Sequence, residues 1–104
     1  MRSLILKLVA KERRGHIGSS MSIVEILRVL YDEILKHKNV KSINRDRFIL
    51  SKGHGCLALY SILYDKKYLN NDHFKNFGTI NSILGGHPEH FVPGVEFSTG
   101  SLGH

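Results

Sequence analysis

The sequence predicts an α/β fold, and three observations support this class. Apolar residues recur at helical spacing in the first third of the chain, and a short apolar run at 47–51 is typical of a buried strand. A glycine-rich turn then leads from this run into a further helix. Strand–turn–helix units belong to parallel sheets, which need more than one such unit. We therefore expect helices plus the first strand of a parallel sheet, in a fold that is incomplete on its own.

Two helices are predicted before this strand. The first spans about residues 2–14, with an apolar face and basic residues toward its end, and Gly15 stops it. The second spans about Ser22 to His37. Ser22 and Glu25 fit a capping box, in which a hydroxyl and a carboxylate three residues apart bind free backbone N–H groups.

Two more helices and a long loop are predicted after the strand. Residues 56–64 form an apolar helix, and a short helix spans 72–77 with Asn71 as its cap. The rest of the chain, from Gly78 on, is expected to be mostly loop, and loops of that length are usually functional or disordered. Because Cys56 lies on the apolar helix, we expect it to pack in the core rather than act as a nucleophile.

Composition bounds the classes of protein. The chain has 104 residues, of which 41% are hydrophobic and 23% charged, which favours one folded domain over disorder. No apolar run approaches the roughly 18 residues that cross a bilayer, so no membrane partner is expected. A single cysteine excludes an internal disulfide framework and indicates a reducing, cytoplasmic setting.

The net charge of +6 favours anionic partners such as phosphorylated metabolites, nucleic acid or anionic lipid, without choosing among them. Basic residues gather between positions 36 and 47, but no aromatic residues are interleaved with them. Nucleic-acid binding is therefore not expected.

Four of the seven histidines directly follow a glycine: His16, His54, His87 and His104. Random placement would give about 0.7 such pairs. Glycine lets backbone and imidazole approach a ligand closely, and imidazole donates to phosphate or hydroxyl oxygens and moves protons near neutral pH. The four pairs together predict a polar site, although any single pair would more readily be explained as a helix stop or a turn.

Two smaller patterns carry less information. Residues 53–55, Gly-His-Gly between a strand and a helix, have the layout of a phosphate cradle but match neither the P-loop nor the dinucleotide pattern. His87, Glu89 and His90 could begin a metal site, but no further ligand has suitable spacing, so we expect no metal ligand set in this chain.

Four segments, in order, resemble signature motifs of the transketolase family: residues 15–27, 46–55, 86–96 and 98–104. The resemblance covers nearly the whole chain and is closest to the N-terminal section of split, two-subunit transketolases. It implies the N-terminal part of a thiamine diphosphate-binding fold, with residues 1–104 as a fragment of that domain. The implied activity is the transfer of a two-carbon ketol unit between sugar phosphates.

The resemblance also implies site residues. His54 would contact the cofactor's diphosphate, while Gly100, Ser101 and Leu102 would line the cofactor, largely through backbone groups. His87 would act at the reacting centre as a proton carrier or hydroxyl ligand, and His16 would contact the sugar hydroxyls.

Mg²⁺ is a second implied cofactor, with its ligands expected on missing downstream sequence. The resemblance therefore implies downstream transketolase polypeptides as partners, a dimeric assembly in the cytoplasm, and an isolated chain without turnover. Two interpretations of another class stay open. The chain could be a catalytically incompetent remnant or a basic anion-binding module.

Overall fold

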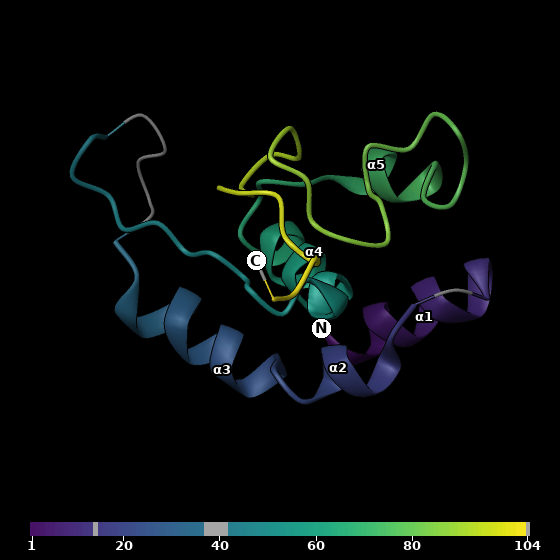
Figure 1. Cartoon of the computed structure of the whole chain (residues 1–104), viewed down its shortest axis with the longest axis horizontal. Coiled ribbons are helices and arrows are strands. Elements are labelled where there is room, and N and C mark those ends of the chain that lie inside the picture. The colour runs from purple at the N-terminus through teal and green to yellow at the C-terminus, as the bar shows by residue number, and fades with distance from the viewer. Residues whose placement is uncertain (14, 37–41, 104) are drawn as a thin grey trace.

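The computed structural model describes residues 1–13, 15–36 and 42–103 (Figure 1). The helical elements are α1 (Arg2–Glu12), α2 (Ile17–Met21), α3 (Val24–Val29), the π-helix η1 (Leu30–Ile34), the 3-10 helix η2 (Gly53–Gly55), α4 (Cys56–Asp65) and α5 (Asn71–Lys75). Within these ranges, no helix is both long and apolar enough to cross a membrane.

Helix α4 is the centre of the core. All its residues from Cys56 to Leu63 are buried, and α1, α2 and α3 each contact it. Figure 1 shows those three helices below α4 and α5 above it, while the last part of the chain passes in front of α4. Because α4 is apolar on nearly every side, it must be shielded from water on every side, and the elements around it provide this cover.

The first predicted helix is confirmed, but it is shorter than expected. Helix α1 ends at Glu12, where Arg13 adopts a left-handed backbone with φ of 50° and its N–H bonds to the Val9 carbonyl. The left-handed residue is therefore Arg13, two positions before the glycine predicted to stop the helix.

The second predicted helix is present as α3 and η1, but its predicted cap at Ser22 is wrong. Helix α2 already precedes Ser22, and α3 begins two residues after it and continues into η1. The Ser22 hydroxyl donates to the Ser19 carbonyl at 3.0 Å and accepts from Lys52 Nζ at 2.9 Å. It caps no helix, because it is used by the preceding turn and by a distant lysine. The predicted end, His37, lies outside the described residues.

The strand expected at 47–51 is not confirmed, since the part of the chain that the structure describes contains no strand. No backbone hydrogen bond joins residues 47–49 to another described segment. A strand exists only with a pairing partner, and these residues have none among the described segments. The helical part of the α/β prediction therefore stands, while its sheet is not observed.

The two later helices follow the prediction closely. Helix α4 ends one residue beyond the expected Tyr64, and α5 begins at Asn71 rather than after it. Its cap is the preceding Asn70, whose side-chain oxygen accepts from the N–H groups of Asp72 at 3.0 Å and His73 at 3.3 Å. The described residues after α5, up to position 103, form loops and turns, as expected.

Candidate functional site

Three histidines that are far apart in sequence meet at one end of α4. His16 precedes α2, His54 lies in η2, and His87 lies in the loop after α5. The ring centroids of His16 and His54 are 4.8 Å apart, and those of His54 and His87 are 4.9 Å apart, with the rings nearly perpendicular in both pairs. We name these three residues the histidine cluster. His16 is exposed and the other two are half-buried, so the cluster opens to solvent at His16.

Helix α4 fixes the loop that carries His87. The Tyr60 hydroxyl lies 2.8 Å from the His87 carbonyl and 3.1 Å from the Gly85 carbonyl, and the Cys56 Sγ lies 3.1 Å from the Gly86 carbonyl. Tyr60 itself is fully buried, and this burial raises the pKa of its hydroxyl, so the group remains a donor. The backbone of the loop is thus bonded to the buried central helix of the fold.

Two glycines allow a close backbone approach beside the cluster. A Cβ on Gly53 would lie 2.6 Å from the Gly100 Cα, and a Cβ on Gly100 would lie 2.3 Å from the His87 Cδ2. Gly100 also has φ of +126°, which L side chains rarely adopt. The three positions therefore pack together only because two of them have no side chain.

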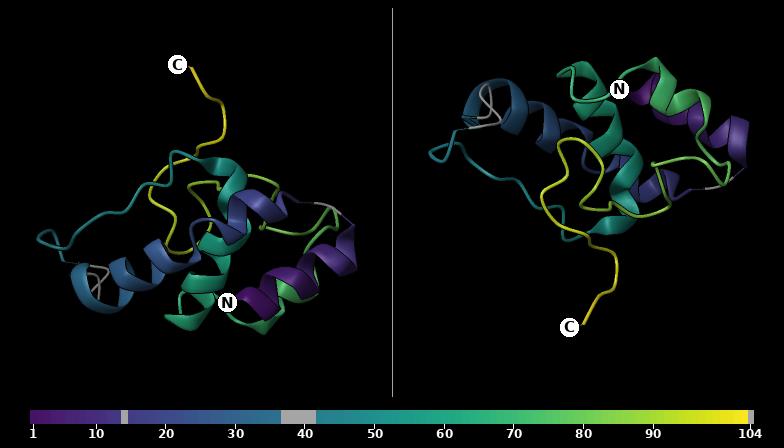
Figure 2. Two further views of the ribbon diagram at one scale, coloured as in Figure 1. Left: turned by 90° about the horizontal axis from the view of Figure 1, so that it is seen from below. Right: turned by 90° about the horizontal axis from the view of Figure 1, so that it is seen from above.

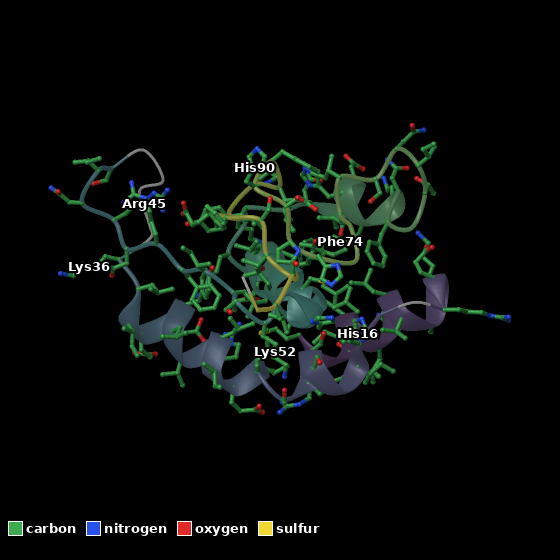
Figure 3. The ribbon with its side chains drawn as sticks, in the orientation of Figure 1. His16, Lys36, Arg45, Lys52, Phe74 and His90 are labelled. Atoms are coloured by element: carbon green, nitrogen blue, oxygen red, sulfur yellow. The ribbon has the colours of Figure 1, made fainter. Side chains whose placement is uncertain are left out.

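A hollow next to His87 is lined by His87, Glu89, Phe97, Ser98, Thr99, Gly100 and Ser101. The His87 Nε2 is shielded from solvent and has no hydrogen-bond partner among the described residues. A buried nitrogen without a partner costs free energy, and a ligand group can supply the missing bond. Lys52, which is labelled with His16 in Figure 3, carries a positive charge and lies two positions before His54 in the sequence.

The other residues predicted for the site differ in whether they reach the hollow. Leu102 is 62% exposed and is absent from the lining of the hollow, whereas Ser101 does line it. Figure 2 shows the end of the chain leading away from the body of the molecule. His90 is exposed and lies against the Ser98 hydroxyl, and His104 lies outside the described residues.

The chemistry of the described residues is consistent with ligand binding more than with metal or thiol chemistry. They contain no group of three or more His, Cys, Asp and Glu side chains that could hold a metal ion. Burial raises the pKa of the Cys56 thiol to about 12, so it is protonated at neutral pH and a poor nucleophile. The expectation that Cys56 belongs to the core is confirmed.

Sequence reasoning missed several residues that position the site. Tyr60 was identifiable only as part of an apolar helix, and Thr99 only as a member of a loop and of the motif at 98–104, with no role of its own. The Thr99 hydroxyl donates to the Leu50 carbonyl at 2.6 Å, and its N–H donates to the Pro88 carbonyl at 3.2 Å. Such contacts join positions 11 to 49 residues apart, so no local sequence pattern predicts them.

The structure is similar to solved transketolases. The transketolase from Leishmania mexicana matches 98% of this chain with a TM-score of 0.87 and 40% sequence identity. The transketolase from Pichia stipitis in complex with sedoheptulose-7-phosphate matches 98% with a TM-score of 0.78 and 37% identity. The matched part is 16% of each of those chains. These similarities and the site place the fold in the thiamine diphosphate-binding class.

A family model described as the transketolase thiamine diphosphate-binding domain matches residues 1–104. The chain therefore belongs to the transketolase family. One subunit of the apulose-4-phosphate transketolase of Phocaeicola vulgatus is 40% identical over 105 residues, and the chloroplastic transketolase of Solanum tuberosum is 43% identical over 108 residues. Each alignment includes 99% of this chain but only 37% and 15% of those proteins, so the chain spans a minor part of its relatives' length.

Proposed function

We propose that this chain forms one wall of the thiamine diphosphate site in a transketolase-type transferase, which moves a two-carbon ketol unit between sugar phosphates. Residues 1–104 act as an N-terminal fragment of that cofactor-binding domain. The observation that carries the proposal is the histidine cluster, in which three separate segments bring each imidazole centroid within 4.9 Å of a neighbour. One of the three, His87, also lines the hollow beside Gly100.

The residues present fit the cofactor. His54 donates to its diphosphate, and Gly100 and Ser101, which line the hollow, contact it through backbone groups, as does Leu102, which follows them in the chain outside the hollow. Two features support this assignment: the His87 Nε2 lacks a hydrogen-bond partner, and the backbone approach at Gly100 leaves no room for a side chain. The net charge of +6 attracts a diphosphate from solution.

The catalytic roles fall to His87 and His16. When bound, thiamine diphosphate supplies the carbon nucleophile for breaking and forming the carbon–carbon bond. His87, half-buried beside the hollow, holds or moves a proton at Nε2 or binds a substrate hydroxyl. His16, at the solvent-exposed end of the cluster, donates to a sugar hydroxyl.

Mg²⁺ and the rest of the site come from downstream transketolase polypeptide, in a dimeric assembly in the cytoplasm. The absence of a metal-ligand group among the described residues supports this division, as does the relative from Phocaeicola vulgatus, whose name describes it as one subunit of a transketolase. The free, buried Cys56 is compatible with a reducing compartment.

Titration calorimetry with thiamine diphosphate tests the proposal. We expect binding by the chain, and a loss of affinity of about tenfold or more in His54→Asn. The matched control is His73→Asn, which removes a histidine from the cap of α5, remote from the cluster, and should leave the affinity unchanged.

An RNA oligomer serves as the competing ligand in the same experiment. Strong, salt-sensitive RNA binding without cofactor binding would favour the basic anion-binding module instead. Equal cofactor affinity of the two histidine variants would also contradict the proposal.

A further inference from the structure

Two loop segments run in the same direction toward the histidine cluster and touch at three places. The contacts join Arg45 to Glu96, Leu50 to Thr99, and Gly53 to Gly100. The first segment ends at His54 and the second at Gly100, which packs on the His87 ring. Neither segment is a helix or a strand before it reaches η2. Their relative position therefore depends on these contacts rather than on a backbone ladder.

The contact farthest along the chain from the histidine cluster is a bidentate ion pair. Arg45 donates from both terminal nitrogens to the two carboxylate oxygens of Glu96, and the Nη2–Oε2 distance is 3.0 Å. The side chains are only 17% and 22% exposed, in contrast to 41% and 49% for the Arg28–Asp65 pair. The planar guanidinium fixes direction as well as distance, which a single-point contact does not.

The innermost contacts transmit that position to the site. The Thr99 hydroxyl binds the Leu50 carbonyl, its N–H binds the Pro88 carbonyl next to His87, and Gly100 follows directly. If residues 96–100 moved away from residues 45–53, Gly100 would leave the His87 ring. The hollow, which residues 97–101 help to line, would lose its shape.

We propose that Arg45 and Glu96 are positioning residues, which clamp the two segments so that the cofactor site is formed before the cofactor arrives. The clamp touches neither cofactor nor substrate, and its consequence for cofactor binding rests on the function proposed above. Without it, residues 96–100 must be ordered at the moment of binding, and the cost of that ordering weakens affinity.

Amide hydrogen exchange of the 104-residue chain tests the clamp without any cofactor. In Glu96→Gln, which keeps the shape but removes the charge, we expect exchange at the Thr99 amide to rise about tenfold. Exchange at Leu63, in the middle of the core, should stay near that of the wild type. A general loss of stability would instead raise exchange at both the Thr99 and the Leu63 amides.

Three further variants complete the design. Arg45→Lys, which cannot donate from two fixed nitrogens, should raise Thr99 exchange partway. The double variant Arg45→Glu/Glu96→Arg restores opposite charges and should recover much of the protection. Arg28→Gln removes a more exposed guanidinium that pairs with Asp32 and Asp65 on another part of the surface, and it should not change Thr99 exchange.

Calorimetry on the same variants links the clamp to the site. We expect thiamine diphosphate affinity to fall about tenfold in Glu96→Gln and to recover in the double variant. If the wild type itself fails to bind the cofactor, the proposed function is wrong, whereas the exchange experiment still decides on the clamp. Unchanged Thr99 exchange in Glu96→Gln, or equal rises at Thr99 and Leu63, would overturn the clamp.

Discussion

Adding a single methyl group at Gly100 is a test of the geometry of the site. An added Cβ would lie 2.3 Å from the His87 Cδ2, so Gly100→Ala must displace either the imidazole or the loop. We expect thiamine diphosphate affinity to fall about tenfold or more, measured by calorimetry. Gly103→Ala is the matched control, because Gly103 also has a positive φ, of 90°, but its Cβ would meet nothing within 4 Å. Similar losses in both variants would mean that backbone strain, not contact with His87, is responsible.

Tyr60 connects the core to the loop that carries His87. Tyr60→Phe removes a buried hydroxyl and leaves the Gly85 and His87 carbonyls without that donor. We expect the free energy of unfolding to fall by about 1–3 kcal/mol in urea titration. Tyr64→Phe removes a hydroxyl that binds Asn71 at a more accessible place, so its loss should stay under about 1 kcal/mol. A reversed order of the two losses would count against the role given to Tyr60.

At the scale of elements, an ion-pair network ties η1 to the end of α4. Asp32 accepts from Lys66 Nζ at 2.6 Å and from Arg28 at 2.8 Å, and Arg28 also binds Asp65. The hydrogen bond from Lys66, followed by the charge of Arg28, holds the pKa of Asp32 below its ordinary value. Stability from this carboxylate is therefore present above the unfolded pKa of about 3.9 and is lost as the pH falls through the lower folded pKa.

In Asp32→Asn we expect the free energy of unfolding to depend less steeply on pH in the acid range than it does in the wild type. Urea unfolding between pH 6 and about pH 3 measures this, and the difference from the wild type should shrink as the pH falls. Glu33→Gln is the control, because Glu33 forms no ion pair with any described residue. A constant difference between Asp32→Asn and the wild type at every pH would contradict the assignment.

The predictability of each element depends on how local its determinants are. Helices α1 and α4 follow from apolar spacing within ten or eleven residues, so the sequence predicts them well. The cap of α5 is displaced by one residue because Asn70 and Asn71 are adjacent and equally suitable in type. Ser22 has the residue type of a cap, but tertiary contact with Lys52 and the preceding turn engage its hydroxyl. The strand at 47–51 fails for the opposite reason, since pairing needs a segment that the described residues do not contain.

The site divides in the same way. Glycine–histidine pairs are visible in the sequence, and three of them converge in the fold. The residues that hold them in place are not visible, because Tyr60 and the Arg45–Glu96 pair act on partners 25 to 51 positions away. Local patterns therefore predict which groups form the cluster more readily than which groups hold it in place.

At the scale of the whole molecule, the described residues provide imidazoles and glycine turns but no group of three or more His, Cys, Asp and Glu side chains that could hold a metal ion. In the proposed site, where His54 contacts the diphosphate, Mg²⁺ adds little to binding by this chain unless protein ligands hold the ion as well. We therefore expect thiamine diphosphate affinity of the isolated chain to change less than about twofold when Mg²⁺ replaces EDTA.

The same titration with the downstream polypeptide present should show a strong Mg²⁺ dependence, together with ketol transfer, which we do not expect from the isolated chain. Calorimetry with and without EDTA measures the first effect, and a sugar phosphate transfer assay measures the second. High ionic strength controls for simple attraction of diphosphate to the net charge of +6, which salt screens. Marked Mg²⁺ dependence in the isolated chain, or turnover by it, would show that these residues hold the ion themselves, contrary to a site shared between polypeptides.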